Sequence, residues 1–212
     1  HTRRMINLTN EDNMELMSRY PNNYFELAIV DPPYGIDVNK MSLGDGAKKQ
    51  KRHKEYKDNS IPKKEYFEEL KRVSKNQIIW GGNYFLDYLN KTKCFLIWDK
   101  IQEFSGADFE MAWTSFNKVS KAFRFSRVEA YGKGTIHPTQ KPVKLYEWLL
   151  MNYAKEGDKI LDTHLGSGSI AIACHNLGFN LTGCELDTEY YEAACKRLKQ
   201  HQAQLTIFNT PE

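Results

Sequence analysis

The residues whose side chains could most readily take part in a reaction follow a short apolar stretch near the start of the chain. Residues 25–36 read FELAIVDPPYGI, and the stretch Leu27–Val30 is typical of a strand buried on both faces. Proline cannot continue a central strand, so the strand must end by presenting Asp31, Pro32, Pro33 and Tyr34. This group offers hydrogen-bond acceptors beside an aromatic plate, although Asp-Pro-Pro also makes a good turn with Tyr34 as a core residue.

A second candidate site lies where a later strand meets a helix. Residues 159–173 read KILDTHLGSGSIAIA, so a strand ends at Asp162 and a turn carries Gly166 and Gly168 before a helix begins. The glycines let a ligand approach the backbone, and the helix start offers free N–H groups. Glu185, at the end of the next predicted strand, is placed to accept hydrogen bonds from ribose hydroxyls. The alternative is a plain turn in which Glu185 caps a helix.

The glycine turn lacks the full dinucleotide fingerprint G-x-G-x-x-G, because Ala171 stands at the last glycine position. An adenosine ligand without a pyrophosphate, such as S-adenosylmethionine (SAM), fits this pattern, and Asp162 would then face the ammonium of its methionine end. The predicted cofactor residues here are Asp162, Thr163, His164, Leu165, Gly166, Ser167, Gly168, Glu185, Leu186 and Asp187.

The elements that must position these motifs alternate between strands and helices. Strands are expected at 6–8, 27–30, 77–80, 94–98, 109–114, 122–125, 159–162 and 180–184. Helices are expected from a Thr9 cap to Pro21, from Pro62 to Val73, and at 142–153, 167–177 and 188–201. This alternation predicts an α/β fold with a Rossmann-like, doubly wound and mostly parallel sheet.

Length and composition indicate one domain spanning residues 1–212. Hydrophobic residues make up 41% of the chain and aromatic residues 13%, which is typical of a globular protein. No stretch approaches the ~20 apolar residues of a membrane span, and no leader is evident, so we expect a cytoplasmic protein. Cys94, Cys174, Cys184 and Cys195 form no Cys-x-x-Cys pair. We therefore expect a reducing compartment, no metal, and cysteines that act as small core residues.

The net charge is only +3, but basic residues are clustered. Residues 48–57 read KKQKRHKEYK, inside a predicted flexible loop at 39–60 that leaves directly from the DPPY motif. Such clusters suit a polyanion such as DNA, although many charge runs are only solvated loops. The candidate DNA-binding residues are Lys48, Lys49, Lys51, Arg52, Lys54, Arg124 and Arg127.

Taken together, the motifs resemble a known enzyme family. DPPY comes first, HPTQKP (137–142) follows, and LDTHLGSGS and GCELD come last. This permuted order resembles the β class of DNA adenine-N6 methyltransferases, in particular the small phage or prophage type. The resemblance implies a SAM-dependent enzyme that acts on double-stranded DNA, releases S-adenosylhomocysteine and needs no metal, and that forms a homodimer in some members. It also implies that Thr139 and Lys141 hold the carboxylate of SAM at a helix start, that His137 orients this part of the cofactor site, and that 116–136 is a short target-recognition segment.

The chemistry of this family fits the DPPY residues. A target amine hidden in a duplex must be swung out into a pocket. Asp31 and a proline carbonyl would accept the two amine hydrogens, Tyr34 would stack on the base, and attack on the SAM methyl would be direct. Asn83 and Tyr84 are expected near this cleft.

Several alternatives remain open. The class often carries Pro-Phe in the glycine motif, where this chain has Thr163, His164 and Leu165. Cytosine-N4 methyltransferases share the fold and the order but usually have Ser in place of Asp31. RNA or protein amine methyltransferases carry similar tetrapeptides with the glycine motif first. A catalytically silent DNA-binding partner subunit would be revealed by failure to bind SAM, and the HPTQKP residues could form a plain turn with Pro142 at a helix start.

Overall fold

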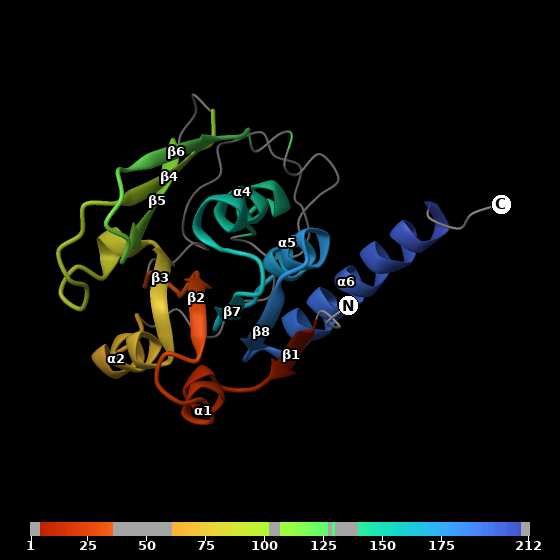
Figure 1. Ribbon diagram of the computed structural model, residues 1–212, viewed down its shortest axis with the longest axis horizontal. Coiled ribbons are helices and arrows are strands. Elements are labelled where there is room, and N and C mark those ends of the chain that lie inside the picture. Colours follow the sequence, from red (N-terminus) through yellow and green to blue (C-terminus); the bar gives the residue numbers. More distant parts are fainter. Residues whose placement is uncertain (1–4, 36–60, 102–106, 127–128, 130–139, 209–212) are drawn as a thin grey trace, which may run out of the picture.

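One eight-stranded sheet organises the chain in the order β1-β8-β7-β2-β3-β5-β4-β6. The computed structural model describes residues 5–35, 61–101, 107–126, 129 and 140–208, and Figure 1 shows the sheet with its helices. The strands are β1 (Ile6–Asn10), β2 (Phe25–Val30), β3 (Ser74–Trp80), β4 (Phe95–Asp99), β5 (Phe109–Thr114), β6 (Lys121–Arg124), β7 (Lys159–Asp162) and β8 (Asn180–Glu185). The helices are α1 (Asn13–Ser18), α2 (Lys64–Val73), the 3₁₀ turn η2 (Gly82–Tyr84), α4 (Val143–Tyr153), α5 (Ser169–Leu177) and α6 (Thr188–Phe208).

The sheet is parallel except at β5, which runs antiparallel to both β3 and β4. The chain leaves β7 through α5 to β8 on one side, and leaves β2 through α2 to β3 on the other. Strands β2 and β7 are paired neighbours, so the direction of winding reverses between them. This confirms the predicted doubly wound, mostly parallel α/β fold, and it places a ligand crevice at the carboxyl ends of β2 and β7.

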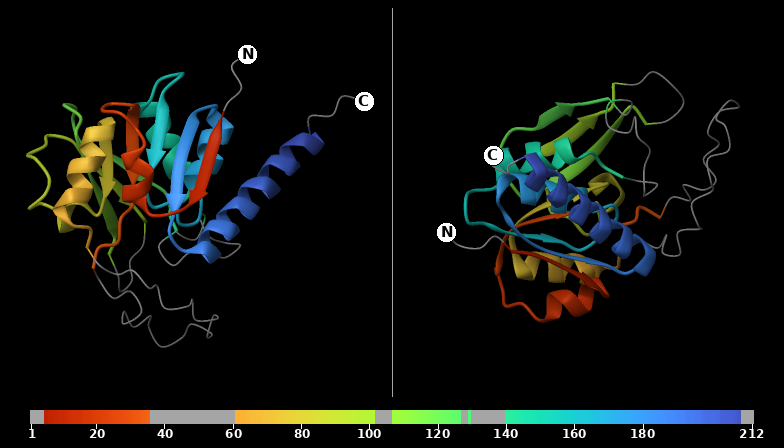
Figure 2. Two further views of the ribbon diagram at one scale, coloured as in Figure 1. Left: turned by 90° about the horizontal axis from the view of Figure 1, so that it is seen from below. Right: turned by 90° about the vertical axis from the view of Figure 1, so that its right-hand side faces the viewer.

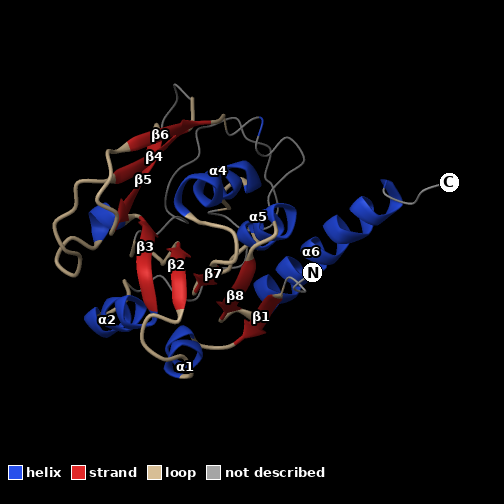
Figure 3. Ribbon diagram, viewed as in Figure 1, coloured by secondary structure: helices blue, strands red, loops and turns tan. Residues whose placement is uncertain are grey.

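Strand β2 is buried on both faces, as its apolar stretch predicts. Leu27 and Ile29 belong to a core cluster with α4 and α5, whereas Ala28 and Val30 belong to a second cluster with α1 and α2. Successive side chains of a strand point to opposite faces, which explains the division. Figures 1 and 3 show these helix pairs on opposite sides of the sheet, while α6 lies beside β1 and β8 and its far end projects away (Figure 2).

The start of the first helix differs from the expectation. Thr9 lies in β1, because this strand pairs with β8 as far as Asn10 and Glu185. The helix is capped instead by Asp12, whose Oδ1 accepts hydrogen bonds from the backbone N–H groups of Met14 and Glu15 at 2.7 and 3.3 Å. The helix expected at 142–153 ends at Tyr153 as predicted, α5 begins at Ser169 because Gly168 has a left-handed conformation, and α6 continues past residue 201.

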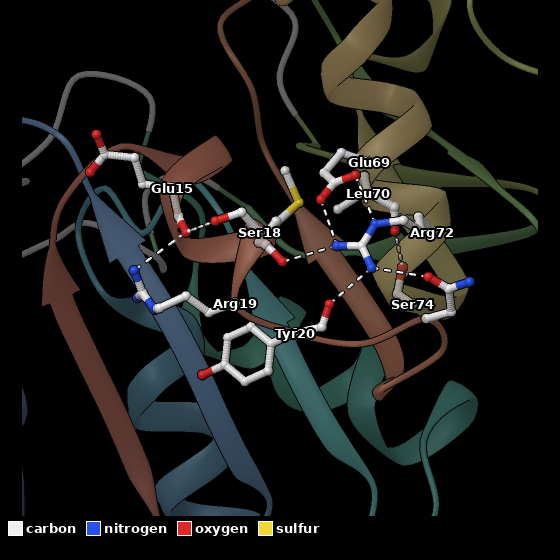
Figure 4. A network of polar contacts seen from close by, with 10 residues as sticks. Glu15, Ser18, Arg19, Tyr20, Glu69, Leu70, Arg72 and Ser74 are labelled. Carbon is white, nitrogen blue, oxygen red and sulfur yellow. Dashed lines mark hydrogen bonds and ion pairs between the residues drawn. The ribbon is translucent and has the colours of Figure 1, made fainter.

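Arg72 fixes the segment that leads into β2 (Figure 4). Its guanidinium donates hydrogen bonds to the backbone oxygens of Met17 and Tyr20 at 3.1 and 2.9 Å, and it pairs with Glu69 at 2.6 Å. These carbonyls lie at the end of α1 and just after it, where helix carbonyls lack intrahelical partners. Arg72 therefore ties α2 to the end of α1, on the face of the sheet that both helices cover.

No helix in the described part of the chain is both long enough and apolar enough to cross a membrane. The cysteines predicted to be core residues are buried at three of the four positions, and only Cys195 is partly exposed.

Candidate active site at the carboxyl edge of the sheet

Three carboxylates meet where neighbouring parallel strands end. Asp31 follows β2, Asp162 is the last residue of β7, and Glu185 is the last residue of β8. The structure therefore brings the DPPY turn and the glycine turn, which are far apart in the sequence, to the two sides of the crevice between β2 and β7. Strand order alone explains this, because the carboxyl ends of parallel strands lie at one edge of a sheet.

Within the DPPY motif, Asp31 and Tyr34 contact each other. The Tyr34 hydroxyl donates a hydrogen bond to Oδ1 of Asp31 at 2.5 Å. The Tyr34 ring lies against Gly81, where an added β-carbon would overlap the ring, and it stacks on Tyr84 with 5.1 Å between ring centroids and 14° between ring planes. Pro32 is buried and Pro33 is partly exposed. Tyr34 also packs on the edge of the second core cluster, so it contacts both the core and the site.

Lys141, which the resemblance predicts to bind a cofactor carboxylate, forms an ion pair with Asp31. Its Nζ donates to Oδ2 of Asp31 at 2.5 Å and lies 2.9 Å from Oε2 of Glu110. Lys100 pairs with Oε1 of the same glutamate at 2.9 Å. The Lys141 side chain is only 1% exposed, and its ammonium lies 5.2 Å from the centre of the Trp80 ring. Lys141 thus forms part of the candidate site through its contact with the DPPY tetrapeptide.

Sequence reasoning missed Glu110 and Lys100. Glu110 is the one acid in the strand sequence FEMAWT, and Lys100 directly follows β4 in WDK. An acid inside a largely apolar strand is itself a signal, since buried charges are paired in folded proteins. Its partners could not be named, because β3, β5 and β4 are paired out of sequence order.

The charges at this end of the site are set by burial and by one another. Burial raises the pKa of Asp31, Lys141 opposes that rise and Glu110 adds to it. Burial also favours neutral Lys141, but the two carboxylates outweigh it and raise the pKa of the ammonium. For Glu110, burial is overcome by Lys141 and Lys100, which lower its pKa to about 2. Lys141 is therefore a cation and Glu110 an anion at neutral pH.

The glycine turn is held by the predicted cofactor carboxylates. Gly166 N–H donates to Oε2 of Glu185 at 2.8 Å, and Asp187 N–H donates to Oε1 at 3.0 Å. Glu185 is 5% exposed and burial raises its pKa. Gly168 has φ +71°, and an added β-carbon would lie 2.9 Å from Cβ of Ala194 on α6, so both conformation and space require glycine. Asp187 itself caps α6 by accepting hydrogen bonds from the next turn.

Asp162 is buried at the carboxyl end of β7, with 2% of its surface exposed. Its Oδ1 accepts a hydrogen bond from His164 N–H at 3.0 Å. Burial raises its pKa to about 8; the His164 N–H opposes the rise, while Asp31 and Glu185 add to it. A cation bound here would relieve that cost, so the position fits the ammonium of an amino acid ligand.

Thr163 and His164, which depart from the family pattern, make polar contacts with residues of α1 and α2. The Tyr66 hydroxyl lies 2.7 Å from Oγ1 of Thr163, which lies 2.9 Å from Nδ1 of His164. Asn13 Nδ2 lies 3.3 Å from Nε2 of the same imidazole. Tyr66 of α2 is buried, and its hydroxyl reaches the glycine turn. Leu165 is buried in the first core cluster and Leu186 is 57% exposed.

A SAM molecule fits the groups present on this edge. The turn offers glycines at Gly166 and Gly168 for close approach, with Ser167 and Ser169 fixed by Arg197 of α6. Among the described residues, the indole Nε1 of Trp80 is a buried donor without an acceptor, beside Lys141. An acceptor of a bound molecule would satisfy it. No group of three or more His, Cys, Asp or Glu suited to a metal occurs in the described ranges.

Several predicted residues lie outside the described residues. These are His137, Thr139, Lys48, Lys49, Lys51, Arg52, Lys54 and Arg127, together with most of 39–60 and 127–136 apart from position 129. Arg124 is described: it ends β6, its side chain is 74% exposed, and Nε donates to Asp99 at 2.9 Å. Asn83 and Tyr84 form η2 beside Tyr34, and Tyr84 is 45% exposed.

Comparison with known proteins gives a consistent result. Residues 91–196 match the family model described as DNA methylase. The chain is 39% identical over 80 residues to the type II methyltransferase M.HpaI of Haemophilus parainfluenzae, a match that covers 37% of this chain and 26% of that protein. It is 32% identical over 112 residues to the type II methyltransferase M2.LlaDCHI of Lactococcus lactis subsp. cremoris, covering 52% and 38%. The matched region therefore spans well under half of these relatives.

Solved structures share the fold over nearly the whole chain. The M1.HpyAVI–SAM complex superposes with a TM-score of 0.63 at 22% identity, covering 91% of this chain and all (100%) of that one. The PvuII DNA methyltransferase, described as cytosine-N4-specific, gives a TM-score of 0.61 at 13% identity, covering 95% and 93%. At these identities the superpositions establish the fold.

Proposed function

The chain belongs to the DNA methylase family, and from this we propose that it transfers the methyl group of SAM to the N6 amine of an adenine flipped out of double-stranded DNA. One observation carries the proposal: Asp31 and the buried Asp162 end neighbouring strands on the two sides of the crevice between β2 and β7. This juxtaposition puts an acceptor for an amine next to a site for a cationic cofactor.

In the proposed mechanism, Asp31 and a backbone carbonyl of Pro32 or Pro33 accept the two hydrogens of the target amine. Tyr34 stacks on the base, with stacking worth ~1–3 kcal/mol. Bound SAM supplies an electrophilic methyl group on a positively charged sulfur. The two acceptors draw the amine nitrogen toward a shape with a free lone pair, and the rigid prolines keep their direction fixed. Positioning and electrostatics then account for most of the acceleration.

The cofactor residues take separate parts in this proposal. Asp162 faces the ammonium of the methionine end and Glu185 accepts hydrogen bonds from the ribose, while the turn at Gly166 and Gly168 lets the ligand reach the backbone. Thr139 remains the candidate for the SAM carboxylate, with His137 orienting the segment that carries it. Because Lys141 pairs with Asp31, we assign it to the amine end of the site.

We further propose that DNA is bound by the basic segment 39–60 and by Arg124, which is exposed on the last strand of the sheet. Lysine and arginine contacts to phosphates give affinity that falls steeply with salt but carries little sequence information. Quadruple replacement of Lys48, Lys49, Lys51 and Arg52 by alanine tests this, and unchanged DNA affinity would contradict it. A homodimer and a place in restriction–modification belong to the same proposal.

The test of the proposed function is a product assay. The purified protein is incubated with labelled SAM and unmethylated duplex DNA, and the nucleosides are analysed by mass spectrometry beside Asp31→Ala. N6-methyladenine that disappears in the variant supports the proposal. N4-methylcytosine would retain the mechanism and change the base, and an absence of SAM binding would favour a catalytically silent partner subunit.

A further inference from the structure

Lys141 is a buried ammonium shared by two carboxylates. Its Nζ lies 2.5 Å from Oδ2 of Asp31 and 2.9 Å from Oε2 of Glu110. Lys100, which is 7% exposed, binds the other oxygen of Glu110 at 2.9 Å. Four charges of alternating sign therefore form a chain that starts at Lys100 and ends at Asp31. Such a chain is balanced, so it can stay buried without a net charge.

Both oxygens of Asp31 already accept hydrogen bonds in this arrangement. Oδ1 accepts from the Tyr34 hydroxyl and Oδ2 accepts from Lys141. An amine that donates to Asp31 therefore competes with these donors for the same buried carboxylate, which is 14% exposed. Only Lys141 has a second carboxylate to turn to, because Glu110 already touches its ammonium.

We propose that the ammonium of Lys141 holds the place of the target amine on Asp31 until the base arrives, and that Glu110, anchored by Lys100, is the carboxylate to which the ammonium then withdraws. An ammonium and an exocyclic amine both present N–H donors to a carboxylate oxygen, so one can stand in for the other. The inference rests on the proposed function, because it takes Asp31 as the acceptor of the amine.

Glu110 is what makes the withdrawal feasible. A buried charge that loses its only partner is strongly destabilised, so a lysine paired with Asp31 alone would resist displacement. Lys141 would keep the Glu110 carboxylate and the Trp80 ring, whose centre is 5.2 Å from Nζ. Lys100 in turn keeps Glu110 ionised and in place. Glu110 and Lys100 are therefore positioning residues that act on Asp31 through Lys141, and no proton has to move.

The arrangement also predicts how the pKa of Asp31 changes when a neighbouring charge is removed. The groups that act on Asp31 are Tyr34 beside it, Lys141 before α4, Glu110 of β5 with its partner Lys100, Asp162 of β7 and Tyr66 of α2. Loss of the Lys141 charge removes an attraction and raises the pKa of Asp31. Loss of the Glu110 charge removes a repulsion and lowers it. These opposite shifts test whether both charges act on Asp31, and the kinetic cycle below tests whether Glu110 acts on the reaction through Lys141.

The test combines Glu110→Gln, Lys141→Gln and the double variant in a cycle. Glu110→Gln leaves the ammonium with Asp31 as its only carboxylate, so we expect the KM for DNA to rise and single-turnover methylation to slow by about tenfold, with the Kd for SAM unchanged. In the Lys141→Gln background the same change should alter the rate less than about twofold, since the residue it acts through is gone. Glu68→Gln is the matched control, because Glu68 pairs with Lys64 on the exposed side of α2, and it should behave like wild type.

A second readout does not need activity. The ¹³C resonance of the Asp31 carboxyl, followed against pH, should titrate at higher pH in Lys141→Gln and at lower pH in Glu110→Gln than in wild type. If wild type yields no methylated base, the proposed function fails while this titration still decides the coupling. An undiminished effect of Glu110→Gln in the Lys141→Gln background, or titrations that shift the same way or not at all, would overturn the inference. Should Glu110→Gln not fold, the double change Lys100→Met with Glu110→Gln removes the carboxylate together with its buried partner charge and carries the same kinetic expectations in the same assays.

Discussion

Gly81 is the position where a single methyl group should separate catalysis from cofactor binding. It follows β3, has φ +67° and supports the Tyr34 ring. A β-carbon placed on it would overlap three atoms of that ring. In Gly81→Ala the ring must move, and its hydroxyl must leave the Asp31 carboxylate that it contacts at 2.5 Å. The glycine turn lies across the crevice on β7 and should keep its shape.

Two terms set the expected loss of stability. The left-handed conformation costs an alanine ~1–2 kcal/mol. Overpacking against a ring that contacts both Gly81 and Tyr84 adds about 1–3 kcal/mol. The sum, roughly 2–5 kcal/mol, corresponds to a fall in Tm of about 5–15 °C for a chain of this length. We expect methylation to fall by more than about tenfold, because Tyr34 is the proposed stacking plate and contacts Asp31.

Gly157→Ala is a control that isolates the first term. Gly157 has φ +88°, but nothing lies within 4 Å of the point that a β-carbon would occupy, so only backbone strain is added. Urea unfolding followed by circular dichroism should show a clearly larger loss for Gly81→Ala than for Gly157→Ala, and the excess should vanish in a Tyr34→Ala background. Equal losses for the two glycines, or weakened SAM binding in Gly81→Ala, would refute the reasoning about Tyr34.

Four other outcomes follow from the described contacts. Burial raises the pKa of Asp162 from 3.8 to about 8, so between these pH values the folded state keeps a proton that the unfolded state has lost. The contribution of Asp162 to the free energy of unfolding should therefore be greatest below pH 4 and should fall by a few kcal/mol as pH rises toward 8. Asp162→Asn should flatten that part of the pH–stability curve and weaken SAM binding in calorimetry. Tyr66→Phe removes the hydroxyl that lies 2.7 Å from Thr163 and should cost about 1 kcal/mol in urea unfolding, with several-fold weaker SAM binding. Arg72→Met removes the described donor of the Tyr20 carbonyl, whereas the Met17 carbonyl keeps the Tyr20 N–H at 3.0 Å, and should cost about 1–3 kcal/mol with little change in Kd for SAM. Arg124→Ala should leave the melting temperature unchanged, because its ion pair is exposed, and should lower the slope of DNA affinity against salt by about 1.

The parts of the fold that could be predicted are those controlled by local pattern. The strand before DPPY was identifiable because four consecutive apolar residues are needed when both faces are covered, and the structure divides them between two clusters. The cap of α1 was not identifiable in the same way. Thr9 and Asp12 are both good caps, and the choice between them depends on how far β1 pairs with β8. Long-range pairing decides such cases.

At the candidate site too, local sequence patterns identify some residues, whereas others depend on long-range strand pairing. Asp31, Asp162 and Glu185 could be selected because each ends a predicted strand, and parallel strands bring such residues to one edge. Glu110 and Lys100 could not be connected to them from the sequence. Their meeting with Lys141 depends on β5 entering the sheet antiparallel between β3 and β4, an order that local periodicity does not encode.

The balance of charge at the crevice argues for a cationic ligand. Asp31, Asp162 and Glu185 are all largely buried, and burial raises the pKa of each. Lys141 compensates Asp31 directly, whereas backbone N–H groups are the partners described for Asp162 and Glu185. A molecule that carries an ammonium and a sulfonium supplies the missing positive charge on the Asp162 side, so its binding should lower the pKa of that carboxyl and release a proton near neutral pH. SAM affinity should therefore increase between pH 6 and 8 in wild type. The absence of that dependence, measured by calorimetry in buffers of different ionisation enthalpy, would remove Asp162 from the cofactor site.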